Sequence, residues 1–341
     1  MLSESLDANV AALLASRKRG RGGFRLEPLS ASGNNRVFTL HCDGDKFVLK
    51  WYFHDASDTR DRLGAEYTFL EHAWNMGLRC IPQPLGKDLN THLAIYEFVE
   101  GYKLEASQVD EFAMRQAAQF LALLNSPQSR AQASALPNAS EACFSVSEHF
   151  AMVDLRLSRL ANMPVESNLD RAATELISRL TAYWNDSKLH LLRGCNALSL
   201  SPDGALPLSE RCLSPSDFGF HNALVRPDGS LCFIDFEYAG WDDPSKTVGD
   251  FFSHPGVAVP HTHLESFLMQ ALAPFESAQQ IAARVRLLEP ISQVKWCCII
   301  LNEFLPVAAR RRNFANPGAD NQVRKQRQLE KASRLFESLQ H

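Results

Sequence analysis

The chain has 341 residues, of which 45% are hydrophobic and 22% are charged, and its net charge is −4. This length is sufficient for two lobes with cores of their own, and the composition is that of a globular protein. The slightly acidic balance argues against a nucleic-acid-binding protein, because that class is normally basic. The longest apolar run, Trp296 to Leu301, is too short to span a bilayer.

Eight cysteines are present without the spacing of a metal site: there is no Cys-x-x-Cys pair, and Cys297 and Cys298 are direct neighbours in an apolar run. This pattern predicts free, mostly buried thiols in a reducing compartment. The basic residues near the N-terminus follow the apolar stretch Ala11 to Leu14, which is the reverse of the order in a signal peptide. We therefore predict a cytoplasmic protein.

The first segment, residues 1–23, is expected to form a short helix and a connector rich in glycine and arginine. Its basic run, Arg17 to Arg21, is interpreted as a solvated tail rather than a nucleic-acid contact, because the run is short and stands alone. We therefore predict that no nucleic acid is a partner.

Residues 24–100 have the pattern of a small β-rich lobe. Two strand-like stretches, 37–40 and 46–52, flank Asp43-Gly44, which is a hairpin signal because glycine accepts a positive φ. A helix is expected from about 57 to 76, and residues 93–99 are typical of a buried strand. The helix is indicated by the spacing of Leu63, Tyr67, Leu70 and Trp74.

Residues 101–341 are mainly helical in pattern, which predicts a larger second lobe. Residues 126–142 are expected to form a loop, with further helices at 146–162, 168–186 and 262–339. A short β-hairpin is predicted between 213 and 236, with its turn at 226–229. Ser107 is expected to cap a helix whose apolar face is formed by Val109, Phe112, Ala113, Ala117, Phe120, Leu121 and Leu124.

Two charged residues of the first lobe stand among apolar neighbours. Lys50 lies in mid-strand and shares a face with Val48, so its ammonium needs an anion, either a phosphate or a carboxylate. Glu66 lies one helical turn from Leu63 and Leu70 and can face Lys50, although a lone glutamate on a helix is more often solvated. The loop at 30–37 could fold over phosphates, but with one glycine a plain turn is the commoner explanation.

The second half of the chain carries a more demanding pattern of aspartate and asparagine. Asp217 is followed by Asn222 and then, after a predicted turn and strand, by Asp235. Asp217 could accept the proton of an attacking hydroxyl, while Asn222 and Asp235 offer the oxygen ligands that Mg²⁺ prefers. Phosphoryl transfer needs mainly positioning, a metal ion and charge compensation, which is what these residues can supply.

With these motifs the chain resembles the aminoglycoside phosphotransferase family, whose relatives include choline and ethanolamine kinases. The resemblance covers residues 24–306 and rests on Asp217-(x4)-Asn222 and on the stretch from Phe233 to Gly240, which is most similar to the choline/ethanolamine branch. It implies an α+β, protein-kinase-like fold with a β-rich N-lobe (24–100) and a helical C-lobe (101–341). It also implies magnesium-dependent transfer of the γ-phosphate of ATP to a small-molecule hydroxyl.

Carried over residue by residue, the resemblance gives each group a role. Lys50 would contact the α- and β-phosphates and pair with Glu66, and Asp217 would be the catalytic aspartate. Asn222 and Asp235 would hold Mg²⁺. The other nucleotide contacts are expected from the phosphate loop, the sheet and the hinge, namely Ser32, Gly33, Asn34, Val37, Val48 and the segment from Glu97 to Val99.

Several positions depart from the family pattern or have two explanations. Pro215 and Asn125 stand where the family commonly has histidines, and His221 is displaced from a third such position near Gly219. A proline could make the loop rigid, since its φ is fixed. Asp250 could brace the catalytic loop, as an aspartate does in the family, or could cap a helix.

Acidic and aromatic residues of the C-lobe are candidates for the acceptor pocket: Glu237, Trp241, Asp242, Trp296 and Glu303. For the residues around Pro244 a capped helix start is an equal alternative, and for Trp296 and Glu303 a buried polar network is the more frequent one. The scattered His254, His261 and His263 lack partners at a convincing spacing, so we predict no zinc site.

The sequence thus favours an active small-molecule kinase with a nucleotide and a hydroxylated acceptor as partners, and it indicates no oligomeric state. One alternative is a non-catalytic nucleotide-binding module, suggested by Pro215 and the glycine-poor loop. A choline or ethanolamine kinase is a more specific alternative. A protein kinase is disfavoured because no Ala-Pro-Glu activation segment follows Asp235.

Overall fold

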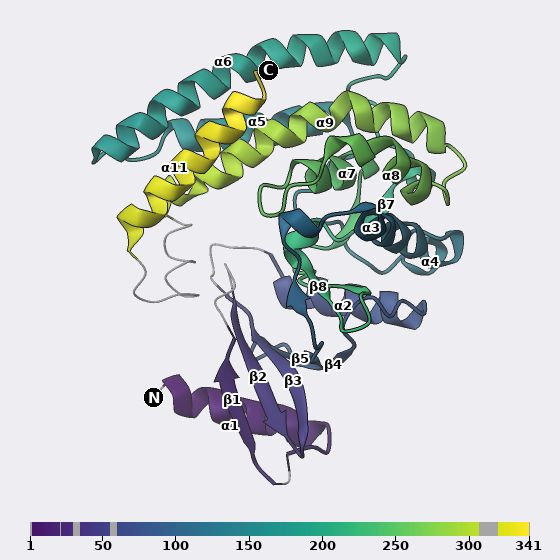
Figure 1. Ribbon diagram of the computed structural model, residues 1–341, viewed down its shortest axis with the longest axis vertical. Coiled ribbons are helices and arrows are strands. Elements are labelled where there is room, and N and C mark those ends of the chain that lie inside the picture. The colour runs from purple at the N-terminus through teal and green to yellow at the C-terminus, as the bar shows by residue number, and fades with distance from the viewer. Residues whose placement is uncertain (1, 21, 30–34, 55–59, 307–319, 341) are drawn as a thin grey trace.

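The computed structural model describes residues 2–20, 22–29, 35–54, 60–306 and 320–340. A small lobe built on a twisted antiparallel sheet lies beside a larger helical lobe (Figure 1). The sheet has five strands in the order β1-β2-β3-β5-β4. These strands are β1 (Phe24–Pro28), β2 (Arg36–Cys42), β3 (Asp45–Trp51), β4 (Pro84–Asp88) and β5 (Leu93–Glu97).

The predicted hairpin at Asp43-Gly44 is confirmed. Cys42 of β2 pairs with Asp45 of β3, and the two residues between them have positive φ values of 53° and 87°. Both values are what a two-residue turn of this hand requires. The turn fixes the register that places Val37 opposite Lys50.

The two faces of this sheet are buried against different parts of the chain. Strand residues alternate between faces, so Leu49 joins Leu40 and Phe47 beneath helix α1 (Leu2–Ser16). Lys50 and Val48 point to the other face, which packs toward helix α2 and the large lobe. This alternation therefore directs the Lys50 ammonium into the space between the lobes.

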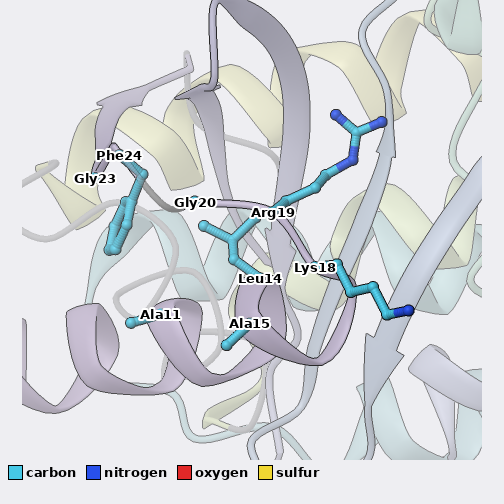
Figure 2. A pocket seen from close by; sticks show the side chains of 8 residues that line it. All are labelled: Ala11, Leu14, Ala15, Lys18, Arg19, Gly20, Gly23 and Phe24. Carbon is cyan, nitrogen blue, oxygen red and sulfur yellow. The ribbon is translucent and has the colours of Figure 1, made fainter.

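Helix α1 and the connector after it enclose a cavity of about 420 Å³ (Figure 2). Arg17, Lys18 and Arg19 are exposed, as predicted for a solvated run, but Arg19 lies over the ring of Phe47 and 3.4 Å from Asp45, so this part of the run contacts the sheet. The cavity is lined by Ala11, Leu14, Ala15, Lys18, Arg19, Gly20, Gly23 and Phe24.

Helix α2 runs from Arg62 to Asn75 and is shorter than the predicted 57–76. Its cap is Asp61, whose carboxylate accepts a hydrogen bond from the Gly64 N–H at 2.8 Å. Residues 55–59 lie outside the described part of the chain. The predicted inward face is confirmed, since Leu63, Glu66 and Leu70 are buried.

The first helices of the large lobe correct two predictions. Helix α3 (Glu111–Leu124) begins after Asp110, which caps it, whereas Ser107 lies in a short 3-10 turn. Phe112, predicted on the apolar face, is exposed, because it lies at the edge of the face formed by Ala113, Ala117, Phe120 and Leu124. The stretch 126–142, predicted as a loop, contains helix α4 (Pro127–Gln132), which Ser126 caps.

The long helices of the large lobe pack together on the side away from the sheet (Figure 1). The predicted helix at 168–186 continues to Ala197, and helix α9, in the region predicted to be helical from 262 to 339, contains Pro290 in its interior. No described helix is long and apolar enough to cross a membrane. After α4, the helices of the large lobe are α5 (Val146–Ala161), α6 (Asn168–Ala197), α7 (Pro244–Ser253), α8 (Leu264–Ala271), α9 (Ala278–Leu301) and α11 (Asn321–Ser338).

Short strands of the large lobe form two small sheets. Strands β7 (Cys212–Ser214) and β10 (Gly240–Asp242) form one pair, and β6 (Tyr102–Lys103), β8 (Ala223–Val225) and β9 (Leu231–Phe233) form a three-stranded sheet. The predicted hairpin between 213 and 236 corresponds to β8 and β9. Asp217 and Asp235 follow the ends of β7 and β9.

Candidate active site

Lys50 meets two carboxylates between the lobes. Its Nζ lies 2.6 Å from Oε2 of Glu66 and 2.5 Å from Oδ1 of Asp235. Burial by itself would lower the pKa of the ammonium, but Asp235 and Glu66 raise it well above its usual value, so Lys50 is charged. Asp235 is 185 residues away in sequence, and this contact therefore joins the sheet to the end of β9.

Glu66 is held in place from three sides. The hydroxyl of Tyr52 donates to its Oε2 at 2.6 Å and in turn contacts the hydroxyl of Tyr96 at 2.7 Å. The backbone N–H of Phe236 donates to Oε1 at 3.3 Å. Burial raises the pKa of Glu66, while its contact with Lys50 opposes that rise. Glu66 is thus a fixed anchor for the lysine.

Asn222 and Asp235 are positioned by backbone bonds on neighbouring segments. The carbonyl of Asn222 accepts from the N–H of Ile234 at 2.8 Å, and its Nδ2 donates to the carbonyl of Asp217 at 3.1 Å. Asp235 has a positive φ of 69°, which turns its carboxylate out of the strand direction. Both side chains can offer oxygen atoms, which are suitable ligands for Mg²⁺.

The loop between β7 and β8 is fixed by an aromatic core. Phe218, next to Asp217, is buried against Phe120 and Phe251 at ring distances of 5.5 Å and 4.9 Å. Phe236, next to Asp235, stacks on Phe69 at 5.3 Å. Asp217 and Asp235 are therefore each adjacent to a side chain that anchors the backbone.

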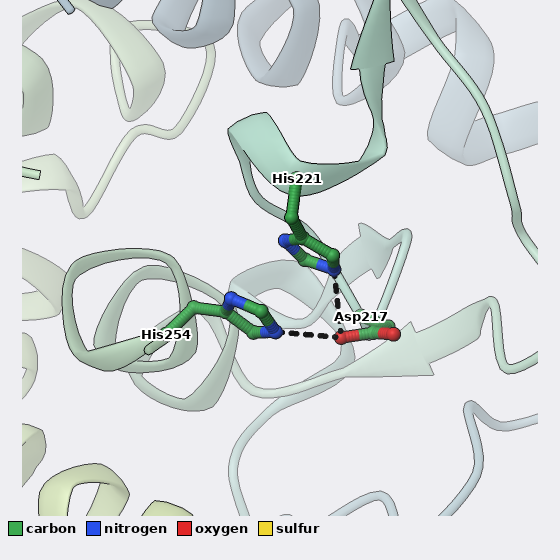
Figure 3. Close-up of side chains that lie close together, drawn as sticks. All are labelled: Asp217, His221 and His254. Atoms are coloured by element: carbon green, nitrogen blue, oxygen red, sulfur yellow. Dashed lines mark ion pairs between the residues drawn. The ribbon is translucent and has the colours of Figure 1, made fainter. Parts of the chain in front are cut away.

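Two histidines face Asp217 (Figure 3). Nε2 of His221 lies 3.4 Å and Nε2 of His254 lies 3.6 Å from Asp217 Oδ1, and the two imidazoles stack 3.5 Å apart. Burial by itself would raise the pKa of Asp217, but His221, His254 and Lys295 bring it below its usual value. Asp217 is therefore ionised at neutral pH.

His254 is a neutral imidazole in this arrangement. Burial lowers its pKa to about 3, and the nearby His221 adds to that effect. The Gly256 N–H donates to Nδ1 at 2.9 Å, so the ring proton lies on Nε2, the nitrogen toward Asp217. Trp296 of α9 meets His254 at a ring distance of 4.2 Å and an interplanar angle of 79°.

This cluster of Asp217, His221 and His254 could suggest a metal site, since its ligand atoms lie within 4.8 Å of one another. Its mixture of nitrogen and oxygen would suit a transition metal rather than Mg²⁺. However, the imidazole planes are nearly parallel, at 5°, and stack face to face, so an ion cannot lie in the planes of both rings. The stacked rings therefore do not suit an ion held by both histidines.

Asn125 braces the loop that carries Asp217. Its buried side chain accepts from the Leu213 N–H at 2.7 Å and donates to the Leu213 carbonyl at 3.0 Å. Asp250 does not cap a helix but forms a buried ion pair with Lys295 of α9. Asn125 thus supplies a backbone anchor at the position where the family commonly has a histidine.

Replacing Asn125 with alanine is expected to destabilise the protein by about 1–3 kcal/mol, because two buried backbone groups lose their partner. Urea denaturation measures this free energy. Asn162→Ala is the matched control, since its amide bonds only to Ser158 at an exposed helix end. Equal stability of the Asn125 variant and the wild type would contradict the bracing role.

Among the predicted acceptor residues, only Trp296 lies beside the histidine cluster. Trp241 donates its indole N–H to the Ala133 carbonyl at 3.0 Å. Asp242 is fully buried in an ion pair with Lys246, and Glu303 pairs with Arg324 of α11 at 3.1 Å. Glu237 accepts from Asn35 and lies 4.0 Å from Arg62. Asp243 caps helix α7, so the alternative prediction of a capped helix start near Pro244 is confirmed.

The predicted nucleotide residues occupy two regions of the sheet. Val37 and Val48 are half-buried on the same face as Lys50. Glu97 ends β5, and its carboxylate accepts from the Gln83 N–H at 3.0 Å; Val99 follows it and is half-buried. Ser32, Gly33 and Asn34 lie outside the described part of the chain.

Three residues near the site were not selected from the sequence. His254 is 37 residues from Asp217, and no local pattern links the two. Asn35 bridges the lobes by donating to Glu237 and accepting from the Phe53 N–H at 3.1 Å. Lys103 donates to the His221 carbonyl at 2.8 Å. The sequence feature that could have identified Lys103 is its position in a short strand just after the hinge.

The sequence profile of the phosphotransferase enzyme family (APH) matches residues 25–254. No curated protein matches the sequence. The structure is similar to an ethanolamine kinase from Plasmodium vivax, with 16% sequence identity, a TM-score of 0.57 and coverage of 93% of this chain and 84% of that chain. It is also similar to a choline kinase from Cryptosporidium parvum, with 14% identity, a TM-score of 0.58 and coverage of 98% of this chain and 97% of that chain. A third similar structure is a spectinomycin phosphotransferase in complex with ADP and spectinomycin, with 12% sequence identity, a TM-score of 0.55 and coverage of 92% of this chain and 93% of that chain. The predicted α+β, two-lobed kinase-like fold is confirmed.

Proposed function

Because this chain belongs to the phosphotransferase enzyme family, we propose that it transfers the γ-phosphate of ATP to a hydroxyl of a small molecule in the presence of Mg²⁺. The observation that carries the proposal is the convergence of Lys50, Glu66 and Asp235, which come from three distant parts of the chain. A charged lysine held between two carboxylates is ready to exchange one of them for a phosphate.

Each residue has a role that its surroundings support. Lys50, anchored by Glu66, would compensate phosphate charge. Asp217 would orient the acceptor hydroxyl and receive its proton; its lowered pKa makes it a weak base, so orientation is the larger part of this role. The oxygens of Asn222 and Asp235 would hold Mg²⁺, which when bound would neutralise charge on the phosphates.

An active enzyme is favoured over a non-catalytic nucleotide-binding module. The loop around Pro215 is ordered without the histidine typical of the family: the Asp217 N–H donates to the Pro215 carbonyl at 2.9 Å, and the Ser216 N–H donates to the Ser214 hydroxyl at 3.0 Å. Asp217 also retains an ionised carboxylate near two histidines. A module released from catalysis has no need of these groups.

A small acceptor is favoured over a protein. The chain passes from Asp235 to strand β10 at Gly240 within five residues and then enters helix α7. An activation segment that could hold an extended peptide does not fit in this short connection. The cytoplasmic location remains a prediction from the cysteine content.

An ADP-release assay tests the proposal. The protein is incubated with Mg-ATP and sugars, polyols, amino alcohols and aminoglycosides, with choline and ethanolamine included for the more specific alternative. Mass spectrometry should find the acceptor heavier by one phosphate. Phosphorylation of a generic protein, with no small acceptor used, would contradict the proposal, and nucleotide binding without any transfer would support the non-catalytic alternative.

A further inference from the structure

Four buried polar atoms around Asp217 form no hydrogen bond of ordinary geometry with the described residues, and the shortest contact among them is the 3.4 Å between His221 Nε2 and Asp217 Oδ1. They are Oδ1 of Asp217, both ring nitrogens of His221 and Nε1 of Trp296. Buried polar atoms are nearly always hydrogen-bonded, because leaving them unpaired is costly. A group of them within one cluster therefore indicates a missing ligand that can both donate and accept.

The cluster is drawn from three elements that meet at Asp217. His221 lies in the short helix Phe220–Asn222, His254 follows helix α7, and Trp296 lies in α9. His221 and His254 stack on each other, and Trp296 contacts His254 (Figure 3 shows the two histidines pointing to Asp217). An indole donates, an imidazole donates and accepts, and a carboxylate accepts. Hydroxyl groups, which do both, can satisfy all of them.

The charges around this cluster disfavour a cationic ligand. Asp217 raises the pKa of His254, while Lys331 of α11 and Lys295 of α9 lower it, so positive charge lies near His254, although that of Lys295 is shared with Asp250. The nearby carboxylates are already paired: Asp250 with Lys295, Asp242 with Lys246 and Glu141 with Arg156. Within this group of described residues, only Asp217 keeps a carboxylate without a cation of its own.

We propose that the acceptor is an uncharged polyhydroxylated molecule, a sugar or polyol, and that His221 and Trp296 hydrogen-bond its hydroxyls beside Asp217. This inference rests on the proposed function and narrows it. Choline has one hydroxyl and would leave most of the unpaired groups unsatisfied, while an ammonium group would have no free carboxylate except Asp217 itself.

The first test compares matched neutral and cationic acceptors. ADP release from Mg-ATP is measured with glucose against glucosamine, glycerol against ethanolamine, and a panel of pentoses, hexoses and inositol against choline and kanamycin. We expect a neutral polyol to give the highest kcat/KM, at least about tenfold above its amino counterpart. Faster transfer to a cationic acceptor than to every neutral one would overturn the inference while supporting the proposed function.

The second test uses Trp296→Phe, which keeps the aromatic ring but removes the indole N–H. We expect the KM for the neutral acceptor to rise about three- to tenfold, the loss of one hydrogen bond, with the KM for Mg-ATP unchanged. Trp74→Phe is the control, because Trp74 lies at the end of α2 against Arg79. An unchanged acceptor KM in Trp296→Phe would remove Trp296 from the site, and the absence of transfer to any small molecule would contradict the proposed function as well.

Discussion

Replacing Asp217 with alanine is expected to lower kcat by about 10²–10⁴-fold, the usual contribution of a positioned base. The carboxylate is half-buried, ionised and fixed by Phe218 and by the loop around Pro215. Its removal leaves the acceptor hydroxyl without an orienting partner. Steady-state kinetics with the acceptor found in the ADP-release assay measure the effect.

The dissociation constant for Mg-ATP should change little in the same variant, because Lys50, Asn222 and Asp235 remain. Asp217→Asn separates geometry from charge: it keeps the shape of the side chain but cannot accept a proton, and because orientation is the larger part of the role it should keep more activity than Asp217→Ala. Asp203→Ala is the control, since this exposed aspartate bonds only to Ser147. Wild-type turnover in Asp217→Ala would refute the assignment.

The parts of the site that could be predicted from the sequence are those fixed by local geometry. Alternation along β3 places Lys50 on the face opposite Leu49, and helical spacing puts Glu66 on the buried side of α2. The Lys50–Glu66 pair was predicted for these reasons and is present. The hairpin at Asp43-Gly44 is equally local, because two residues with positive φ determine it.

The contacts that were missed depend on long-range packing. The stacking of His221 on His254 requires η3 (Phe220–Asn222) and the end of α7 to meet, and nothing in either segment specifies the other. Whether an acidic side chain is free depends on such packing as well. Arg324, which neutralises Glu303, comes from α11, on the far side of residues 307–319. Only Lys246, four residues after Asp242, could have been identified as a partner from helical spacing.

The hypothesis of an acidic acceptor pocket changes for the same reason. An acidic and aromatic pocket was one hypothesis from Trp241, Asp242, Trp296 and Glu303, but the structure gives the acids cationic partners and the Trp241 indole a backbone carbonyl. The number of acidic residues in a predicted pocket therefore does not give the charge of the pocket, because each acidic side chain can be paired with a basic one. What stays unpaired here is a set of neutral donors and acceptors around one carboxylate.

Replacing Asp235 with asparagine is expected to weaken binding of Mg-ATP by about 10–100-fold, because a charged ligand oxygen is lost beside the phosphates. The affinity for ATP without metal should stay equal or increase. Asp235 repels bare phosphates, and its removal frees the Lys50 ammonium, now 2.5 Å away, for the nucleotide. Titration calorimetry with ATP in the presence of Mg²⁺, and again with a chelator, measures both constants.

The opposite signs of the two changes make this experiment specific to a metal ligand. A structural aspartate whose loss disturbed the lobes would weaken both forms of ATP together. Asp228→Asn is the matched control, because this exposed aspartate caps the turn between β8 and β9 through the Ser230 N–H at 2.9 Å and should alter neither constant. Thermal unfolding of both variants shows whether Lys50 keeps its place with Glu66 alone. An equal loss of affinity with and without Mg²⁺ in Asp235→Asn, at unchanged stability, would rule out Asp235 as a magnesium ligand.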